Sequence, residues 1–308
     1  MPLEPEVSPR VRAALEAGRP VVALESTIIS HGLPRPGNLE AARSFEELLT
    51  DAGVTPATIA VIDGAPAIGL ADSDLERIAL DESVVKASNR DLGLAMAGKR
   101  TAGTTVAATS VLAARAGIRV FATGGLGGVH RGYAGTLDES ADLTVLSRTR
   151  ITVVSAGVKS ILDIPATLER LETLGVAVAG YRTNRFPAFY LSDSGVGLDW
   201  RLDTPEEIAS VMAARDSLGE ESALLIGNPL PPDRQLDPAL HDRVLREALE
   251  AAESAGIRGH EVTPFLLDYM QRATAGGSVA VNLDVARGNI ALAGRIAAAW
   301  ASLRPERA

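Results

Sequence analysis

Short apolar runs rich in valine and isoleucine alternate along this chain with amphipathic stretches, and this alternation restricts the fold more than any other feature. The runs that predict strands are residues 21–26, 58–63, 83–88, 118–125, 151–157, 176–181 and 222–228. The stretches between them that predict helices are residues 37–53, 72–80, 105–117, 165–175 and 204–219. Strands that are apolar throughout are typical of a parallel sheet covered on both faces. The sequence therefore predicts a three-layer α/β/α sandwich with a largely parallel, mixed central sheet.

The later part of the chain has a different character. It is mostly helical, from residues 237–256 to residues 289–303. No linker, low-complexity tract or repeat interrupts the sequence, and 46% of its 308 residues are hydrophobic, enough for a substantial core. We expect one α/β/α catalytic domain over residues 1–308, with a helical C-terminal region.

Charge and composition exclude several classes of protein. A net charge of −9 argues against a nucleic-acid polymer as ligand, because phosphate backbones attract basic surfaces. No apolar run is long enough to span a membrane, and no signal peptide is evident. The absence of cysteine fits a cytoplasmic protein. We therefore expect a cytoplasmic protein that acts on a small molecule.

Polar residues follow several predicted strands at the end where parallel sheets bind ligands. Glu25 ends the first predicted strand, Lys86 lies near the end of the third, and Lys159 follows the fifth. The glycine-rich segment 124–132, which contains His130, follows the fourth. We expect these groups to converge on one rim of the sheet.

Lysine is rare in this chain: of its 30 basic residues only Lys86, Lys99 and Lys159 are lysines. Because arginine supplies positive charge elsewhere, the lysines are candidates for work that needs a neutral amine. Lysines in desolvated sites can have a pKa of about 7–8 and act as nucleophiles or bases. Lys159 could instead extend from a strand end to water. Its rarity and the flanking residues 155–158 favour a nucleophile that forms a Schiff base with a sugar.

Three other features each allow two interpretations. Glu25 could be a structural carboxylate or a buried general acid with a raised pKa. Segment 102–110 begins a helix with a glycine and two threonines, which suits an anion or simply caps the helix, and it lacks the lysine of a P-loop. The glycines of 124–132 could form a flexible turn or allow close approach to the backbone.

An acidic segment is a candidate metal site. Asp138, Ser140 and Asp142 occupy alternate positions, so an extended backbone would place all three on one side. Carboxylate oxygens suit a hard cation such as Mg²⁺ or Mn²⁺, although a solvated acidic turn is equally compatible. His241 and His260 have no such neighbours in the sequence, and no role is assigned to them.

Long segments of the chain, in this order, resemble the pseudouridine-5'-phosphate glycosidase family. The resemblance covers nearly the whole chain and is carried by "ALESTIISHGLPRPGNLE" (23–40), "VIDGAPAIGL" (61–70), "KASNRDL" (86–92), "GTTVAATS" (103–110), "FATGGLGGVHRG" (121–132), "ESADLTVLSRT" (139–149), "VVSAGVKSILDIPATLERLETLGV" (153–176) and "YRTNRFPAFY" (181–190). It implies reversible cleavage of the carbon–carbon glycosidic bond of pseudouridine 5'-phosphate to uracil and ribose 5-phosphate. It further implies a lyase of the pseudouridylate synthase type or a hydrolase, with one Mn²⁺ or another divalent cation such as Mg²⁺ per subunit, in a homotrimer.

The resemblance also implies a role for particular residues. Lys159 would be the Schiff-base nucleophile and Glu25 the proton donor, and Asp138 would hold the metal through its hydration shell. The residues that would bind substrate are Lys86, Val106, His130, Ser140, Ala141, Asp142 and Asn282. Two departures are visible: Glu139 stands where the family usually has an apolar residue, and segment 281–293, which contains Asn282, is a looser version of the C-terminal motif.

The implied reaction explains why a lysine is needed. A nitrogen-linked base departs once it is protonated, which a pair of carboxylates can arrange, whereas a carbon-linked uracil is a poorer leaving group. An imine between Lys159 and the anomeric carbon of the opened ribose supplies another route, with a proton from Glu25 going to the uracil ring. Arginine cannot form that imine. The alternatives are a Schiff-base aldolase or isomerase that acts on another phosphosugar, and a non-catalytic phosphosugar-binding protein.

Overall fold

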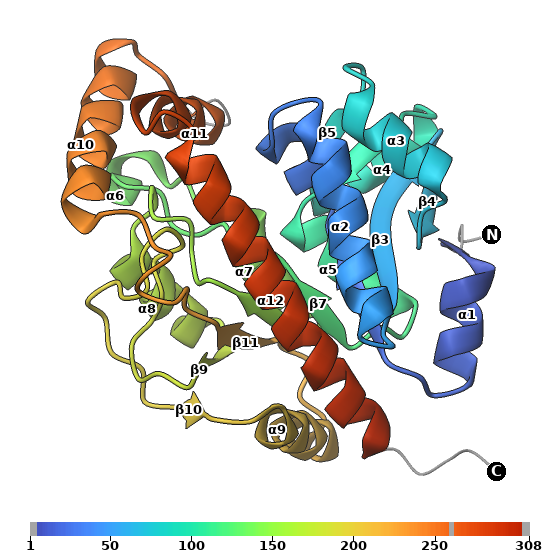
Figure 1. Cartoon of the computed structure of the whole chain (residues 1–308). Helices are drawn as coiled ribbons and strands as arrows, with labels where there is room; N and C mark the ends of the chain where they lie inside the picture. Colours follow the sequence, from blue (N-terminus) through green and yellow to red (C-terminus); the bar gives the residue numbers. More distant parts are fainter. Residues whose placement is uncertain (1–4, 259–261, 304–308) are drawn as a thin grey trace.

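A single sheet runs through the protein, whose structure is a computed structural model that describes residues 5–258 and 262–303 (Figure 1). In the described part this sheet has eleven strands, and His260 lies outside that part. Its main row is, in order, β1 (Glu6–Val7), β4 (Ala65–Ile68), β3 (Thr55–Ile62), β2 (Val21–Leu24), β7 (Val120–Ala122), β8 (Thr152–Ser155), β11 (Leu224–Gly227), β9 (Ala177–Tyr181) and β10 (Arg201–Leu202). From β3 to β10 every neighbouring pair is parallel.

The sheet is mixed at one side only. β4 and the short strand β6 (Ala102–Thr104) both pair antiparallel with β3. β5 (Val85–Ala87), which carries Lys86, pairs with β6 and so stays outside the main row. The predicted largely parallel, mixed sheet is confirmed, but Lys86 reaches the rim from a side branch of it.

Helices cover both faces of the sheet and make three layers. On one face lie α2 (Gly37–Asp51), α9 (Pro205–Leu218) and the long α12 (Gly277–Ser302), which contacts both of the others and crosses the front of Figure 1. The other face carries α1 (Pro9–Glu16), α4 (Leu92–Ala97), α5 (Val106–Arg115), α7 (Ala141–Leu146) and α8 (Ile164–Thr173). The three-layer prediction is therefore confirmed.

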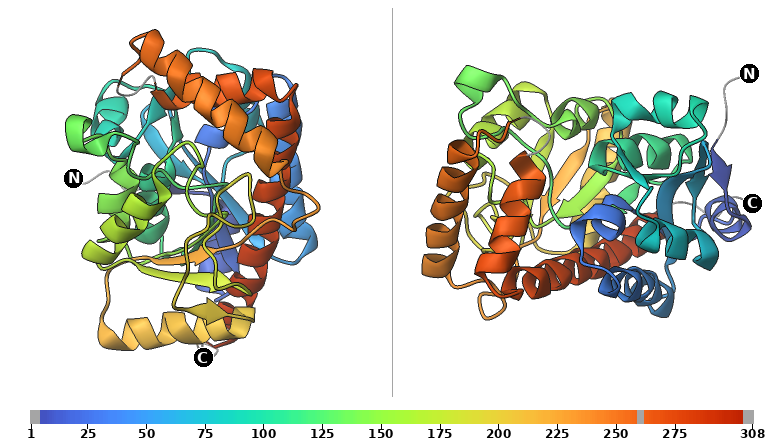
Figure 2. Two further views of the ribbon diagram at one scale, coloured as in Figure 1. Left: turned by 90° about the vertical axis from the view of Figure 1, so that its left-hand side faces the viewer. Right: turned by 90° about the horizontal axis from the view of Figure 1, so that it is seen from above.

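The remaining helices lie at the margins. α10 (Pro238–Ser254) and α11 (Val262–Ala273) pack against each other at one end of the molecule (Figures 1 and 2). The short elements are α3 (Asp72–Leu80), α6 (Tyr133–Thr136), the π-helix η1 (Ile28–Gly32) and the 3₁₀-helix η2 (Asn89–Asp91). None of the described helices has the length and apolar character that crossing a membrane requires.

Local sequence signals account for where the elements begin and end. At α9, Thr204 and Glu207 form a capping box, Pro205 fills the first turn, and Gly219 ends the helix with φ +72°. The central strands β2, β8 and β11 are buried along their whole length, as expected for strands covered on both faces. The parallel arrangement directs the carboxyl ends of these strands towards one rim.

Candidate active site

Glu25, Lys86 and Lys159 come together at this rim although they are far apart in the sequence. Glu25 directly follows β2, Lys86 is in β5, and Lys159 lies shortly after β8. Burial raises the pKa of Glu25 above its ordinary value, the charges of Lys159 and Lys86 oppose that rise, and the Asp142 carboxylate adds to it. Glu25 therefore keeps its proton to a higher pH than an exposed glutamate, as a general acid requires.

Lys86, in β5, interacts electrostatically with the same charged side chains. Its side chain is accessible to solvent, yet enough protein surrounds the amine that desolvation lowers the pKa of Lys86, and the charge of Lys159 lowers it further. Desolvation and then Lys86 also lower the pKa of His31, whose Nδ1 is 2.7 Å from Ser30 Oγ. His31 lies in η1 and was not anticipated from the sequence. Partial burial and neighbouring positive charge thus lower the pKa of two basic side chains beside the rim.

A chain of hydrogen bonds holds the Glu25 carboxylate. The Thr123 hydroxyl, just after β7, donates a hydrogen bond to Glu25 Oε1. The carbonyl oxygens of Thr123 and Gly124 accept hydrogen bonds from Asn289 Nδ2 at 2.7 and 3.1 Å. Asn289 Oδ1 in turn accepts one from Asn228 Nδ2 at 2.9 Å. The buried Asn289, which sequence reasoning missed, thus connects α12 to the residue that orients Glu25.

The segment with Asp138, Ser140 and Asp142 is extended only as far as Ser140, because helix α7 begins at Ala141. Ser140 caps α7, its hydroxyl accepting from Asp142 N at 3.2 Å, and Asp142 lies in the first helical turn. The buried Asp142 carboxylate accepts from Ala107 N at 3.0 Å through Oδ1 and from Gly127 N at 2.8 Å through Oδ2. Because these oxygens serve backbone amides, Asp142 ties the start of α5 to the glycine loop. The Asp142 side chain therefore occupies part of the predicted anion site at the start of α5.

The glycines after β7 allow close packing by the side chains of the protein itself. A methyl group at Gly125, Gly127 or Gly128 would collide with the side chains of Phe189, Ser140 or Thr167, respectively. Asn282, in α12, directs its Oδ1 towards Gly124, and this buried atom has no hydrogen-bond partner among the described residues. The loop is thus closely packed, as the second of the two interpretations anticipated, and an acceptor beside it is left free.

A strained residue supports the segment that leads to Lys159. Phe189 has φ +60°, which is unusual for a bulky side chain, and its amide donates to Ala156 O at 2.8 Å. Gly157, with φ +77°, lies so close to Pro187 O that it has no room for a side chain. Segment 181–190, which carries part of the family resemblance, thus holds the turn before Lys159 in place.

Asp138 and His130 form the outer part of the rim. His130 Nδ1 is 3.8 Å from Asp138 Oδ2, and His130 N donates to Asp138 O at 3.0 Å. Desolvation lowers the pKa of His130, Asp138 opposes this change, and Lys159 reinforces it. Glu139 pairs with Arg170 at 2.9 Å. In residues 5–258 and 262–303, no three histidine or acidic side chains are grouped to hold a metal ion.

The other predicted site residues lie at helix starts beside this rim. Val106 is the buried first residue of α5, and Ala141 is the exposed first residue of α7. Lys99 does not join them, because it lies against Gly64 in the turn between β3 and β4. His241 is buried in α10, where its Nε2 contacts Ser160, the residue after Lys159.

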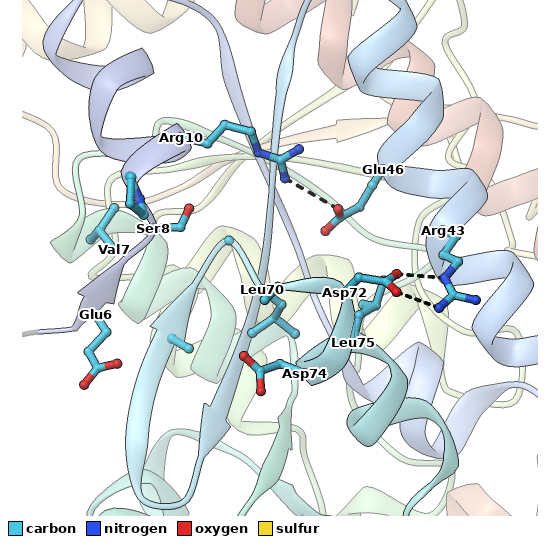
Figure 3. Close-up of a pocket in the computed structure, with 14 residues that line it drawn as sticks. Glu6, Val7, Ser8, Arg10, Arg43, Glu46, Leu70, Asp72, Asp74 and Leu75 are labelled. Atoms are coloured by element: carbon cyan, nitrogen blue, oxygen red, sulfur yellow. Dashed lines mark hydrogen bonds and ion pairs between the residues drawn. The ribbon is translucent and has the colours of Figure 1, made fainter.

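An open cleft of about 740 Å³ lies away from this rim, between α1, β4, α2 and α3 (Figure 3). Arg43 pairs there with Asp72 at 2.8 Å, and Arg10 approaches Glu46 at 3.5 Å. None of the predicted site residues lines it. Arg10, Arg43, Glu46 and Asp72 are therefore engaged with one another in this cleft.

Glu46, in this cleft, leads to a prediction about stability. Burial raises its pKa, while the Thr58 hydroxyl, which donates to Oε1 at 2.6 Å, and Arg10 oppose the rise. Because the folded-state pKa lies above the unfolded value, ionisation at higher pH weakens the folded state. Glu46→Gln keeps the acceptor for Thr58 and should raise the melting temperature near pH 8 but not near pH 4, as calorimetry can measure. Thr58→Val should have the opposite effect near pH 8, and a lower melting temperature for Glu46→Gln there would contradict the argument.

Comparison with known proteins identifies the family. The family model described as Indigoidine synthase A like protein matches residues 10–299. A pseudouridine-5'-phosphate glycosidase of Saccharopolyspora erythraea is 61% identical over 302 residues, which cover 98% of this chain and 100% of the relative. The chain belongs to the pseudouridine-5'-phosphate glycosidase family. The corresponding glycosidase of Staphylococcus aureus is 47% identical over 294 residues, 96% of each chain.

Solved structures of similar proteins share the fold of this family member. The prealnumycin C-glycosynthase AlnA, in complex with ribulose 5-phosphate, aligns with a TM-score of 0.91 and 38% identity, over 97% of this chain and 98% of that one. An indigoidine synthase A-like protein of Thermotoga maritima aligns with a TM-score of 0.87 and 36% identity, over 96% of each chain. In this member of the pseudouridine-5'-phosphate glycosidase family, the segments that carried the resemblance supply Glu25, Thr123 and Lys159 to one rim.

Proposed function

We propose that this protein reversibly cleaves the carbon–carbon glycosidic bond of pseudouridine 5'-phosphate to give uracil and ribose 5-phosphate. The observation that carries the proposal is Lys159 close to the buried acid Glu25, in a chain that is 47–61% identical to relatives named pseudouridine-5'-phosphate glycosidase. A C-glycosynthase of the same fold that is bound to ribulose 5-phosphate supports a phosphosugar as substrate.

In the proposed mechanism Lys159 is the nucleophile. Opening of the ribose ring breaks the bond between the anomeric carbon and the ring oxygen; that oxygen gains a proton and uracil N1 loses one. The anomeric carbon is then double-bonded to the uracil ring and electrophilic, and the Lys159 amine adds there. The nitrogen lone pair then forms a carbon–nitrogen double bond while the electron pair of the glycosidic bond moves to uracil C5. Water hydrolyses the resulting imine, which releases ribose 5-phosphate and restores the amine.

Glu25 provides the proton that uracil C5 takes as the bond breaks. Burial keeps this carboxyl protonated to a higher pH than usual, and Thr123 orients it. The glycosidic bond is broken by electrons from nitrogen and not by attack of water. The proposed reaction is therefore that of a lyase, and the alternative of a hydrolase, raised by the sequence, is wrong.

The surrounding groups are proposed to bind the two ends of the substrate. The groups suited to the phosphate and the ribose are Lys86, His130, Ser140, Ala141, Asp142 and the backbone at Val106. The free Oδ1 of Asn282 beside Gly124 can accept a hydrogen bond from a uracil N–H. Because Asp142 serves two backbone amides, its contribution is mainly to orient the helix start and the glycine loop around the substrate.

A divalent cation, one Mn²⁺ or Mg²⁺ per subunit, is proposed to bind next to Asp138. The carboxylate of Asp138 is partly exposed, whereas those of Glu139 and Asp142 are engaged. One partly exposed carboxylate fits a hydrated cation that takes most of its ligands from water and phosphate. When bound, the cation would offset the negative charge of the substrate phosphate.

Removal of the cation should therefore abolish turnover, and Mn²⁺ should restore it better than Ca²⁺, which prefers more ligands. Asp138→Asn should weaken Mn²⁺ binding by about 10–100-fold, since it removes the carboxylate that accepts hydrogen bonds from the water molecules around the cation. Calorimetric titration of the protein with Mn²⁺ and ribose 5-phosphate measures this without relying on activity. Glu139→Gln, which removes a neighbouring carboxylate already paired with Arg170, should bind Mn²⁺ like the wild type. Full activity after chelation would rule the cation out.

One assay tests the function. The protein is incubated with pseudouridine 5'-phosphate and Mn²⁺, and uracil is measured by chromatography, with unphosphorylated pseudouridine as control. Uracil should appear only from the phosphorylated substrate, because a remote charged group contributes the binding energy that positions the reacting carbon. If no uracil appears and another phosphosugar is turned over, the protein is an aldolase or isomerase. If it binds ribose 5-phosphate without turnover, it is a non-catalytic phosphosugar-binding protein.

We also propose that the chain works as a homotrimer in the cytoplasm. The family resemblance supports the trimer, and the absence of cysteine supports the compartment. Sedimentation velocity measures the mass of the assembly directly.

A further inference from the structure

A histidine from the helical C-terminal region contacts the turn that carries Lys159. His241 lies in α10, and only 3% of it is exposed. Its Nε2 is 2.8 Å from Ser160 Oγ, a contact between residues 81 positions apart. Ser160, itself only 3% exposed, directly follows Lys159. The candidate nucleophile is therefore next to a buried side-chain hydrogen bond that connects two distant parts of the chain.

The other ring nitrogen determines the direction of this hydrogen bond. His241 Nδ1 is 3.0 Å from Asp242 Oδ1. A carboxylate can only accept, so Nδ1 carries the proton, and Nε2 of the neutral ring accepts from the Ser160 hydroxyl. Asp242 thus selects the tautomer, and the tautomer orients the Ser160 hydroxyl.

Other bonds hold the same turn from the side of the glycine loop. Lys159 N donates to Leu126 O at 3.1 Å, and Lys159 O accepts from Leu162 N at 3.0 Å. Arg131 donates to Ser160 O at 3.5 Å and to Ile161 O at 3.3 Å. Ser160 is thus held through its carbonyl by the glycine loop and through its hydroxyl by α10. With both sides held, the backbone at Lys159 has little freedom to rotate.

The order Ser160, His241, Asp242 has the connectivity of a hydrolytic triad, but its environment does not fit one. The nucleophile of a triad must reach substrate, whereas Ser160 is buried. The acid that orients a triad histidine is usually buried, whereas the Asp242 side chain is 67% exposed. These residues therefore fit a supporting role better than a nucleophilic one.

We propose that His241 is a positioning residue: through Ser160 it fixes the backbone at Lys159 and hence the direction from which the amine approaches the sugar. The proposal rests on the proposed function, in which Lys159 is the nucleophile. A misplacement of about 1 Å at a reacting atom can cost about 10²-fold in rate. Binding of the phosphate depends on other residues, so loss of His241 should affect kcat and leave KM nearly unchanged.

The test combines steady-state kinetics with chemical trapping. Ribose 5-phosphate at saturation and borohydride convert the Lys159 imine into a stable adduct, whose rate of formation mass spectrometry follows. In His241→Leu and Ser160→Ala, trapping and kcat should both fall by about 10–100-fold. His241→Gln, whose Oε1 can accept from Ser160, should recover much of the loss. The double variant should lose no more than the worse single variant, because both changes remove one interaction.

A matched control separates positioning from general destabilisation. Thr149→Val removes another buried hydroxyl, which donates to Val145 O at 2.7 Å before the opposite end of β8. It should lower the melting temperature without slowing trapping. The proposal is overturned if the wild type is trapped normally and His241→Leu is trapped at the same rate. It is also overturned if His241→Leu differs from the wild type in KM alone. A wild type that yields no adduct refutes the proposed function and this inference with it.

Discussion

Replacing Lys159 with arginine is expected to abolish uracil release while the protein remains folded. Arginine keeps the positive charge and serves almost everywhere else in this chain, so it would be tolerated if charge were all that mattered. It cannot add to the anomeric carbon and lose a proton to form an imine. Loss of the covalent route should therefore lower kcat by about 10⁴-fold or more, which leaves the catalysis that binding alone provides.

Trapping with borohydride provides the decisive measurement. Wild-type protein incubated with ribose 5-phosphate should gain the mass of one reduced adduct, located on Lys159 by peptide mapping. Lys159→Arg should gain none, and Lys86 and Lys99 should stay unmodified in both proteins. Lys99→Arg is the matched control: Lys99 lies against Gly64, away from the rim, so the adduct on Lys159 should form as before. An active Lys159→Arg variant, or an adduct on Lys86, would contradict the mechanism.

Glu25→Gln is expected to produce the second largest loss. Glutamine preserves the shape of the side chain and an acceptor for the Thr123 hydroxyl, but it cannot donate a proton to uracil C5. General acid catalysis contributes about 10²–10⁴-fold, so kcat for cleavage should fall by that factor while the fold is kept. Stopped-flow absorbance of the uracil chromophore measures the step. A Glu25→Gln variant with normal kcat would assign the proton to another group.

The pH dependence follows from the raised pKa of Glu25. The protonated form is the donor, so the rate of cleavage should fall as the pH rises through this pKa. Because the folded state holds this proton more tightly than the unfolded state, the associated stability is also lost as the pH rises. The hydrogen bond from Thr123 lowers the pKa of Glu25, so Thr123→Val should move the fall in cleavage rate to higher pH. Glu25→Gln should show no such fall in rate, and a fall that persists would be caused by a different residue.

Strong apolar patterns were sufficient to predict the layers of this fold. The predicted strand at 151–157 and the predicted helix at 204–219 correspond to β8 and α9, since each combines a clear period with defined ends. The short strands β4 and β6 were missed because "APAI" and "AGT" contain proline, alanine and glycine, which have little intrinsic preference for strands. Their pairing with β3 is a tertiary effect that local sequence does not encode.

The site was predicted in outline and not in its supporting contacts. The rule that ligands collect at strand ends placed Glu25 and Lys159 on one rim, where the structure has them. Asn289 was missed because α12 was expected to begin near it, whereas the helix begins at Gly277. Polar residues such as Asn282 and Asn289 interrupt the apolar period there, and they do so because they face the glycine loop. Spacing alone could not reveal a contact between residues 166 positions apart.

Attachment of the glycine loop to α12 also has a consequence for the order of events during synthesis. The ribosome produces residues 277–302 after Glu25, Lys86 and Lys159 have already left it, and folding of a long chain begins before synthesis is complete. Until α12 packs on the sheet, the carbonyls of Thr123 and Gly124 lack Asn289, and the acid beside them is not held. In the proposed mechanism, a nascent chain therefore carries the Lys159 amine before Glu25, the proposed proton donor, is held in place. Competence to break a carbon–carbon bond arises only with the docking of α12.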